Sequence, residues 1–96
     1  MPRFKLSREA KRDLIRIGRY TLGRWGDEQA VRYLTALDAR FRALAANPRL
    51  GRPCDEIKSG YRYIREGRHA IFYKMTDEGI SVMRILHERM LPGRHL

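Results

Sequence analysis

The sequence predicts an α+β fold in which one strand and two helices precede three antiparallel strands. Apolar residues recur at helical spacing in the first half of the chain, and short strand-like runs separated by turns fill the second half. The chain of 96 residues suffices for a single domain, 1–96. We expect the helices to form a hairpin packed on one face of the sheet, with the other face open.

The first half of the chain contains a short edge strand at residues 3–6 and two helices. A basic amphipathic helix is expected from Ser7 to Arg24, with the Ser7 hydroxyl capping its first turn. Gly26 can adopt the left-handed geometry that ends a helix, and Asp27 is placed to cap the next one. That second helix must stop at Pro48, because the residue before proline disfavours helical geometry.

The apolar positions of these helices predict much of the core. Tyr33, Leu37 and Phe41 recur at helical spacing on one side of the second helix. Trp25 lies at the turn between the helices, where we expect its ring to staple them together.

The second half of the chain predicts an antiparallel meander. A loop with prolines and glycines spans 48–60, and strand-like runs follow at 61–65, 69–75 and 80–86. The last run alternates Ile80, Val82, Arg84 and Leu86 against the residues between them. Short turns join these runs, which indicates antiparallel neighbours. The tail, 87–96, is expected to be irregular.

The charge of the chain favours an anionic partner. The formal net charge is +10, and residues 1–24 contain eight Lys or Arg against Glu9 and Asp13. Nucleic acid, an acidic protein and an anionic membrane surface all fit this charge. The narrow apolar stripe of the first helix favours packing on a core over lipid binding.

Several classes of protein are excluded or disfavoured. A single cysteine, Cys54, rules out an intramolecular disulfide, and no zinc-ligand spacing occurs. The Gly-Arg-Pro at 51–53 lacks the residues of a phosphate-binding loop. We therefore expect no metal or cofactor. The amino terminus has no secretion signal, and no apolar run reaches the roughly 20 residues that span a bilayer, so a cytoplasmic location is expected.

The order of the elements and five sequence stretches resemble the ParE branch of the RelE/ParE toxin superfamily. The stretches are WGDEQA at 25–30, NPRLGRP at 47–53, GYR at 60–62, HAIFY at 69–73 and ISVMRILHERM at 80–90. They occur in the family's order and spacing, and the resemblance covers residues 4–96. It implies the toxin of a type II toxin–antitoxin system, held inactive by the wrapping carboxy-terminal segment of a ParD-like antitoxin. Several such toxins poison DNA gyrase and are not known as enzymes.

This resemblance directs the choice of binding residues. The family's antitoxins are commonly acidic, so we expect one to bind in a groove between the helical hairpin and the sheet. Arginine and aromatic side chains are common interface anchors. The candidates for antitoxin binding are Arg16, Arg19, Tyr20, Arg24 and Arg62. The candidates for target binding lie in the carboxy-terminal segment and are Arg84, His87, Arg89, Met90 and Arg94.

Two alternatives stay open. RelE-like relatives share the fold and cut messenger RNA on the ribosome, for which Arg62, Arg84 and His87 are the candidate catalytic residues. Some of those relatives pair a histidine at the position of His87 with a tyrosine, whereas Glu88 follows here, which argues against nuclease activity. Alternatively, the basic helix could contact phosphates, although no base-stacking or groove-reading motif is present, so sequence-specific nucleic-acid binding is not expected.

Overall fold

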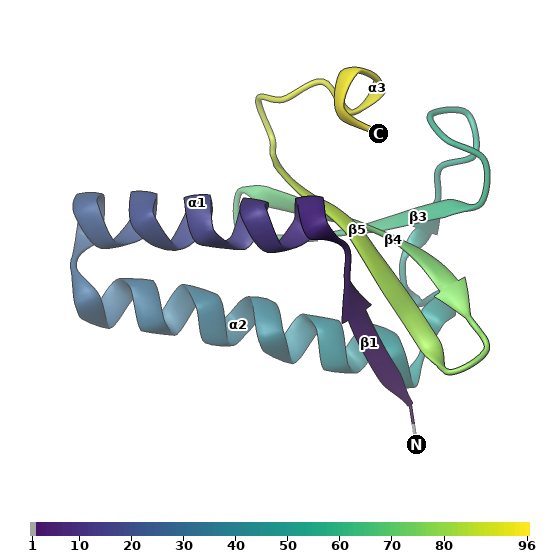
Figure 1. Ribbon diagram of the computed structural model, residues 1–96, viewed down its shortest axis with the longest axis horizontal. Coiled ribbons are helices and arrows are strands. Elements are labelled where there is room, and N and C mark those ends of the chain that lie inside the picture. The colour runs from purple at the N-terminus through teal and green to yellow at the C-terminus, as the bar shows by residue number, and fades with distance from the viewer. Residues whose placement is uncertain (1) are drawn as a thin grey trace.

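The computed structural model describes residues 2–96 as a long helical hairpin packed against one end of a twisted sheet (Figure 1). The α+β class and the helix–helix–meander order are confirmed. The elements are β1 (Arg3–Leu6), α1 (Arg8–Trp25), α2 (Asp27–Ala46), the 3-10 helix η1 (Pro48–Leu50), β2 (Arg52–Pro53), β3 (Tyr61–Glu66), β4 (His69–Thr76), β5 (Gly79–His87) and α3 (Pro92–His95).

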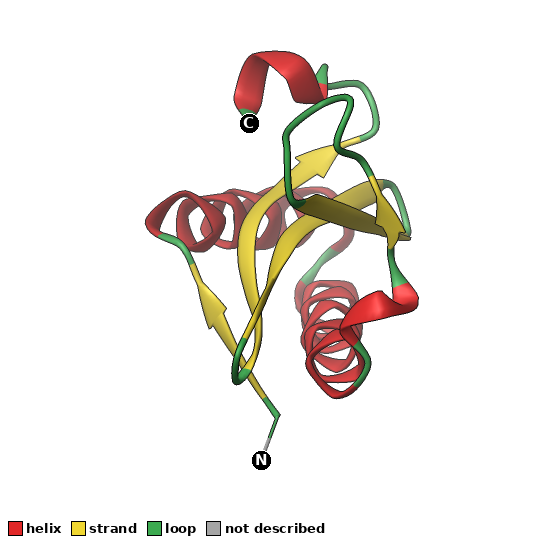
Figure 2. Ribbon diagram, turned by 90° about the vertical axis from the view of Figure 1, so that its right-hand side faces the viewer, coloured by secondary structure: helices red, strands yellow, loops and turns green. Residues whose placement is uncertain are grey.

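The sheet has five strands in the order β1-β5-β4-β3-β2. The predicted edge strand β1 runs parallel to β5, with Phe4 opposite Ile80, and the other strands pair antiparallel. The short strand β2 was not predicted, because its two residues lie in the stretch expected to be loop. Pro53 is tolerated there because β2 is an edge strand, where a missing N–H is harmless. Figure 2 shows the twist of the sheet and places α3 away from α2.

The two helices begin and end close to the predicted positions. The Ser7 hydroxyl accepts a hydrogen bond from the Ala10 N–H at 3.0 Å, which confirms the predicted cap, and donates to the Met83 carbonyl at 2.7 Å. Gly26 has a φ of 92°, a conformation that favours glycine. The prediction for Asp27 was wrong: Gly26 occupies the cap position and Asp27 is the first residue of α2.

The main core lies between the hairpin and the sheet. Leu37 and Phe41 of α2 are buried against Ile71 of β4 and Ile85 of β5, and Tyr33 packs at the margin. The predicted alternation along β5 was wrong beyond Val82. An irregularity in the β4–β5 register inserts an extra residue there, so Val82 and Ile85 both face the helices.

The opposite face of the sheet is covered rather than open. A second buried cluster there contains Cys54, Tyr61, Phe72 and Leu86. Two residues of the tail, Met90 and Leu96, pack against it. The tail was predicted to be irregular, but it includes the short helix α3 and is bonded to the sheet: an Arg84 Nη1–H donates to the His95 carbonyl at 2.9 Å. Apolar residues of the tail therefore close the face that strand alternation alone leaves exposed.

The predicted role of Trp25 as a staple was wrong. Its side chain is 65% exposed at the last position of α1. The hairpin tip projects beyond the sheet (Figure 1), so the tip has no sheet behind it to bury the ring. Instead, the Arg24 guanidinium lies 5.3 Å from the centroid of the Trp25 ring.

Candidate functional site

Two grooves flank α1 on opposite sides. The outer groove, of about 600 Å³, lies between α1, α2 and β1. The inner groove, of about 730 Å³, lies between the carboxy-terminal half of α1, the start of α2 and the adjoining ends of β4 and β5. Both have the size of a typical ligand site.

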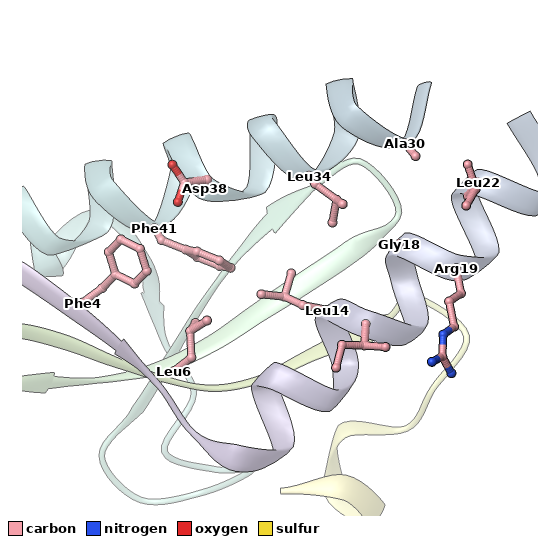
Figure 3. Close-up of a pocket in the computed structure, with 11 residues that line it drawn as sticks. Phe4, Leu6, Leu14, Gly18, Arg19, Leu22, Ala30, Leu34, Asp38 and Phe41 are labelled. Carbon is pink, nitrogen blue, oxygen red and sulfur yellow. The ribbon is translucent and has the colours of Figure 1, made fainter. Parts of the chain in front are cut away.

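The outer groove is mainly apolar. Leu14 of α1 points towards Leu34 and Phe41 of α2, and these side chains form its wall (Figure 3). Exposed Leu22 continues the apolar surface along α1. Arg19 lies at the rim and extends from α1 away from α2 (Figure 3). Such a groove suits the apolar face of a partner helix, a recurrent mode of recognition.

The inner groove brings together residues that the sequence analysis assigned to two different surfaces. Arg16, Tyr20 and Arg24 are spaced four residues apart and therefore share one face of α1, which lines the groove. His87, Arg89 and Met90, from the end of β5 and the segment after it, line it as well. Three of the predicted antitoxin residues and three of the predicted target residues thus share one cavity.

A hydrogen-bonded cluster lies within the inner groove. The Tyr33 hydroxyl donates to the Glu66 carbonyl at 2.8 Å and lies 2.6 Å from His69 Nδ1. The hydroxyl has one proton and a carbonyl can only accept, so His69 Nδ1–H must donate to the Tyr33 oxygen. Gly67 makes this arrangement possible: its φ is 58°, and a Cβ there would lie 2.7 Å from the Tyr33 ring.

The two histidines of the cluster meet edge to face, with ring centroids 5.3 Å apart. Burial, and then the neighbouring His87 ring, lower the pKa of His69 to about 4. His69 is therefore neutral at pH 7 and leaves Nε2 as an acceptor. His87 Nδ1 accepts from the Arg89 N–H at 3.1 Å, so its neutral ring carries the proton on Nε2. The cluster offers one ring donor and one ring acceptor.

Arg84 has an internal role rather than a free side chain. Its side chain is 17% exposed, and its guanidinium forms a two-pronged ion pair with Asp13: Nε lies 2.8 Å from Oδ2 and Nη2 lies 3.0 Å from Oδ1. The Ile85 N–H, at the edge of β5, also donates to Asp13 Oδ2 at 2.9 Å. Hydrogen bonding to Asp13 raises the pKa of Arg84 further. This network joins α1 to β5.

Asp13 was not predicted as a key residue. It is only 2% exposed and lies between the buried positions Ala10 and Ile17 on one face of α1. The available signal was a single acid at position i+3 of a helical stripe whose positions i and i+7 are apolar. Buried carboxylates need a partner, and the strand runs contained several candidate arginines.

The other predicted residues lie outside the inner groove. Arg62 is opposite Tyr73 in the β3–β4 register, and its Nε is buried without a hydrogen-bond partner among residues 2–96. Arg94 is exposed on α3. Two other arginines pair with the Glu88 carboxylate: Arg65 Nη2 lies 2.8 Å from Oε2, and Arg68 Nη1 lies 3.1 Å from Oε1. Neither Arg62 nor Arg94 lines either groove.

Two further classes of feature are not found in the described chain. No group of three or more His, Cys, Asp or Glu side chains within residues 2–96 is placed to hold a metal ion. No helix in the same range is long and apolar enough to cross a membrane.

Comparison with known proteins decides the family. The family model described as the ParE toxin of the type II toxin–antitoxin system parDE matches residues 4–92. The chain belongs to the ParE toxin family. It is therefore the toxin component of a type II toxin–antitoxin system.

Relatives of this ParE family member match nearly end to end. Toxin ParE1 of Mycobacterium tuberculosis strain H37Rv is 47% identical over 95 residues, covering 98% of this chain and 97% of the relative. Toxin ParE1 of Caulobacter vibrioides is 38% identical over 96 residues, covering 100% and 99%.

Solved structures share the fold. A chain of the chromosomal ParDE toxin–antitoxin system of P. aeruginosa superposes with a TM-score of 0.76 at 23% identity, covering 91% of this chain and 96% of that chain. A chain of the toxin–antitoxin complex RelBE2 of M. tuberculosis superposes with a TM-score of 0.63 at 21% identity, covering 90% of this chain and 90% of that chain. This chain thus shares its fold with a chain from each of these two toxin–antitoxin structures.

Proposed function

We propose that this ParE-family toxin poisons DNA gyrase and is held inactive by a ParD-like antitoxin. The observation that carries the proposal is the 47% identity to Toxin ParE1 over almost the whole of both chains. The P. aeruginosa structure of the same fold comes from a ParDE system, which supports a ParD-like partner. These partners imply a protein that acts in the bacterial cytoplasm.

The antitoxin would bind α1 on two sides, at the outer groove and at the inner groove. Apolar side chains of an antitoxin segment would fill the outer groove, and its carboxylates would pair with Arg16, Arg19 and Arg24. Tyr20, which is 59% exposed on the same helix, would be covered by it. A segment long enough to continue to β3 would also reach Arg62. Burial of an apolar face together with rim ion pairs combines affinity with fast association.

The target surface would be the segment after β5. His87, Arg89 and Met90 line the inner groove, and Arg94 is exposed on α3 nearby in sequence. The toxin would act by binding rather than by catalysis. Of the candidate nuclease residues Arg62, Arg84 and His87, only His87 lines the groove, and Arg84 is paired with Asp13.

The test combines purified toxin with gyrase and supercoiled plasmid, and in a parallel tube with ribosomes and messenger RNA. We expect linear DNA with gyrase covalently attached in the first tube, and intact RNA in the second. Toxin preincubated with its antitoxin serves as the matched control and should leave the plasmid supercoiled. Cleaved RNA with unaffected gyrase would refute the gyrase target and indicate an RNA-cleaving toxin.

A further inference from the structure

We propose that the inner groove binds a single-stranded nucleic acid, with phosphates against Arg16, Arg24 and Arg89 and unstacked bases against Tyr20 and Trp25. This inference goes beyond the proposed gyrase and antitoxin functions and depends on neither. It rests on the charge, the exposed aromatic rings and the two histidines of one cavity.

The groove has cations that are not neutralised within the chain. Its one acid, Asp13, is occupied by Arg84, and its fourth arginine, Arg68, is paired with Glu88. Arg24 and Arg89 form no ion pair with residues 2–96. Arg16 Nη1 lies 3.8 Å from Asp13 Oδ1, a long ion pair, and the Arg16 side chain is 68% exposed. Guanidinium groups arranged along a groove suit a chain of phosphates.

The same groove presents two large aromatic side chains to solvent. Tyr20 is 59% exposed and Trp25 is 65% exposed, and both lie on the last turns of α1. The Arg24 guanidinium lies 5.3 Å from the Trp25 ring centroid, and the ring stays exposed. Aromatic faces beside a basic groove are what proteins that bind single strands use to stack bases.

Two histidines that line the groove, His69 and His87, have polar ring atoms suited to base edges. His87 offers a donor at Nε2, and His69 an acceptor at Nε2, because their Nδ1 atoms are held by the Arg89 N–H and the Tyr33 hydroxyl. A cavity of about 730 Å³ has room for a nucleotide. A duplex keeps its base faces stacked inside, so only an unpaired strand can use Tyr20 and Trp25.

An acidic peptide is the competing ligand, and the proposed antitoxin segment would be one. Its carboxylates would use the arginines, but a peptide of acidic residues has no aromatic bases to stack on Tyr20 and Trp25. The apolar outer groove offers a peptide more side-chain burial. The strand and the antitoxin would share Arg16, Tyr20 and Arg24, so the strand would bind the toxin that is free of antitoxin.

The experiment uses the intact chain alone, without gyrase or antitoxin, so its result is independent of the proposed function. Fluorescein-labelled oligothymidylate of about 12 nucleotides is titrated and followed by anisotropy. Unlabelled oligothymidylate is followed by the fluorescence of Trp25, the single tryptophan of the chain. We expect saturable binding that quenches Trp25. A Tyr20→Leu variant should bind several-fold more weakly, because it loses a stacking surface.

Two double variants with equal loss of charge separate the groove from diffuse attraction. Arg16→Gln with Arg24→Gln removes two groove cations, whereas Arg8→Gln with Arg12→Gln removes two from α1 outside both grooves. The first should weaken binding by about tenfold and lower the salt slope by roughly 0.7 per lost phosphate contact. The second should stay within about threefold of the parent chain.

Two outcomes would overturn the inference. Equal losses in both double variants would mean that the net charge alone attracts the strand. Poly-L-glutamate that binds as tightly as oligothymidylate and quenches Trp25 equally would make this a groove for acidic peptides.

Discussion

At the residue scale, Asp13 determines how the first helix is attached to the sheet. Its carboxylate neutralises Arg84 and also accepts from the Ile85 N–H, at the edge of β5. The Arg84 side chain in turn donates to the His95 carbonyl. A single buried acid therefore links α1, the last long strand and the tail.

We expect Asp13→Ala to lower the free energy of unfolding by about 3–5 kcal/mol, because it leaves the mostly buried Arg84 charge and the buried Ile85 N–H without their partner. Urea unfolding followed by circular dichroism measures this as a lower midpoint with an unchanged slope. Asp38→Ala is the matched control, since the Asp38–Arg42 pair is exposed, and should lose less than about 1 kcal/mol. Equal losses for the two variants would contradict the role assigned to Asp13.

Individual residues were predictable from the sequence when the deciding forces are local. The Ser7 cap depends on a hydroxyl three residues before its donor, and it was predicted correctly. Trp25 was misplaced because its burial depends on how far the hairpin extends past the sheet. Asp13 was missed because its partner is 71 positions away in the sequence.

At the scale of elements, three faces of α1 each make a different set of contacts. Its buried face contacts the sheet, one flank lines the outer groove and the other lines the inner groove. The helical spacing of Arg16, Tyr20 and Arg24 was visible in the sequence. Their meeting with the end of β5 was not, because it depends on where the meander turns beneath the helix.

The proposed antitoxin contact can be tested on this helix. Arg16→Glu combined with Arg19→Glu should weaken binding of the cognate antitoxin about tenfold and flatten its dependence on salt, because two rim cations are reversed. Calorimetric titration at several salt concentrations measures both effects.

The control reverses two cations elsewhere on the same helix. Arg8→Glu with Arg12→Glu changes the net charge equally and should leave the affinity within about threefold. Unchanged affinity in the Arg16 and Arg19 variant would place the antitoxin on a different surface.

At the scale of the whole molecule, the tail is both part of the fold and the proposed target surface. Met90 and Leu96 cover Phe72 and Leu86, and Glu88 binds Arg65 and Arg68. The sequence predicted the meander but not this cover, since the prolines and glycines of the tail have no strong periodicity. Removal of residues 88–96 therefore cannot separate binding from folding.

The point variants Arg89→Glu and Arg94→Glu together can make that separation. Both side chains lie outside the two buried clusters, so the free energy of unfolding, measured in urea, should stay within about 0.5 kcal/mol of the parent chain. Deletion of 88–96 should instead cost about 2–4 kcal/mol, because it uncovers Phe72 and Leu86.

If the tail binds the target, the double variant should be folded but should yield much less linear plasmid with gyrase, since reversed charges oppose the same contact. Growth after induction without antitoxin gives a second readout, and cells with the double variant should keep dividing. Full gyrase poisoning by a folded double variant would exclude Arg89 and Arg94 from the target surface. His87 and Met90 would then remain, together with the hairpin tip at Trp25, which is exposed and projects beyond the sheet (Figure 1).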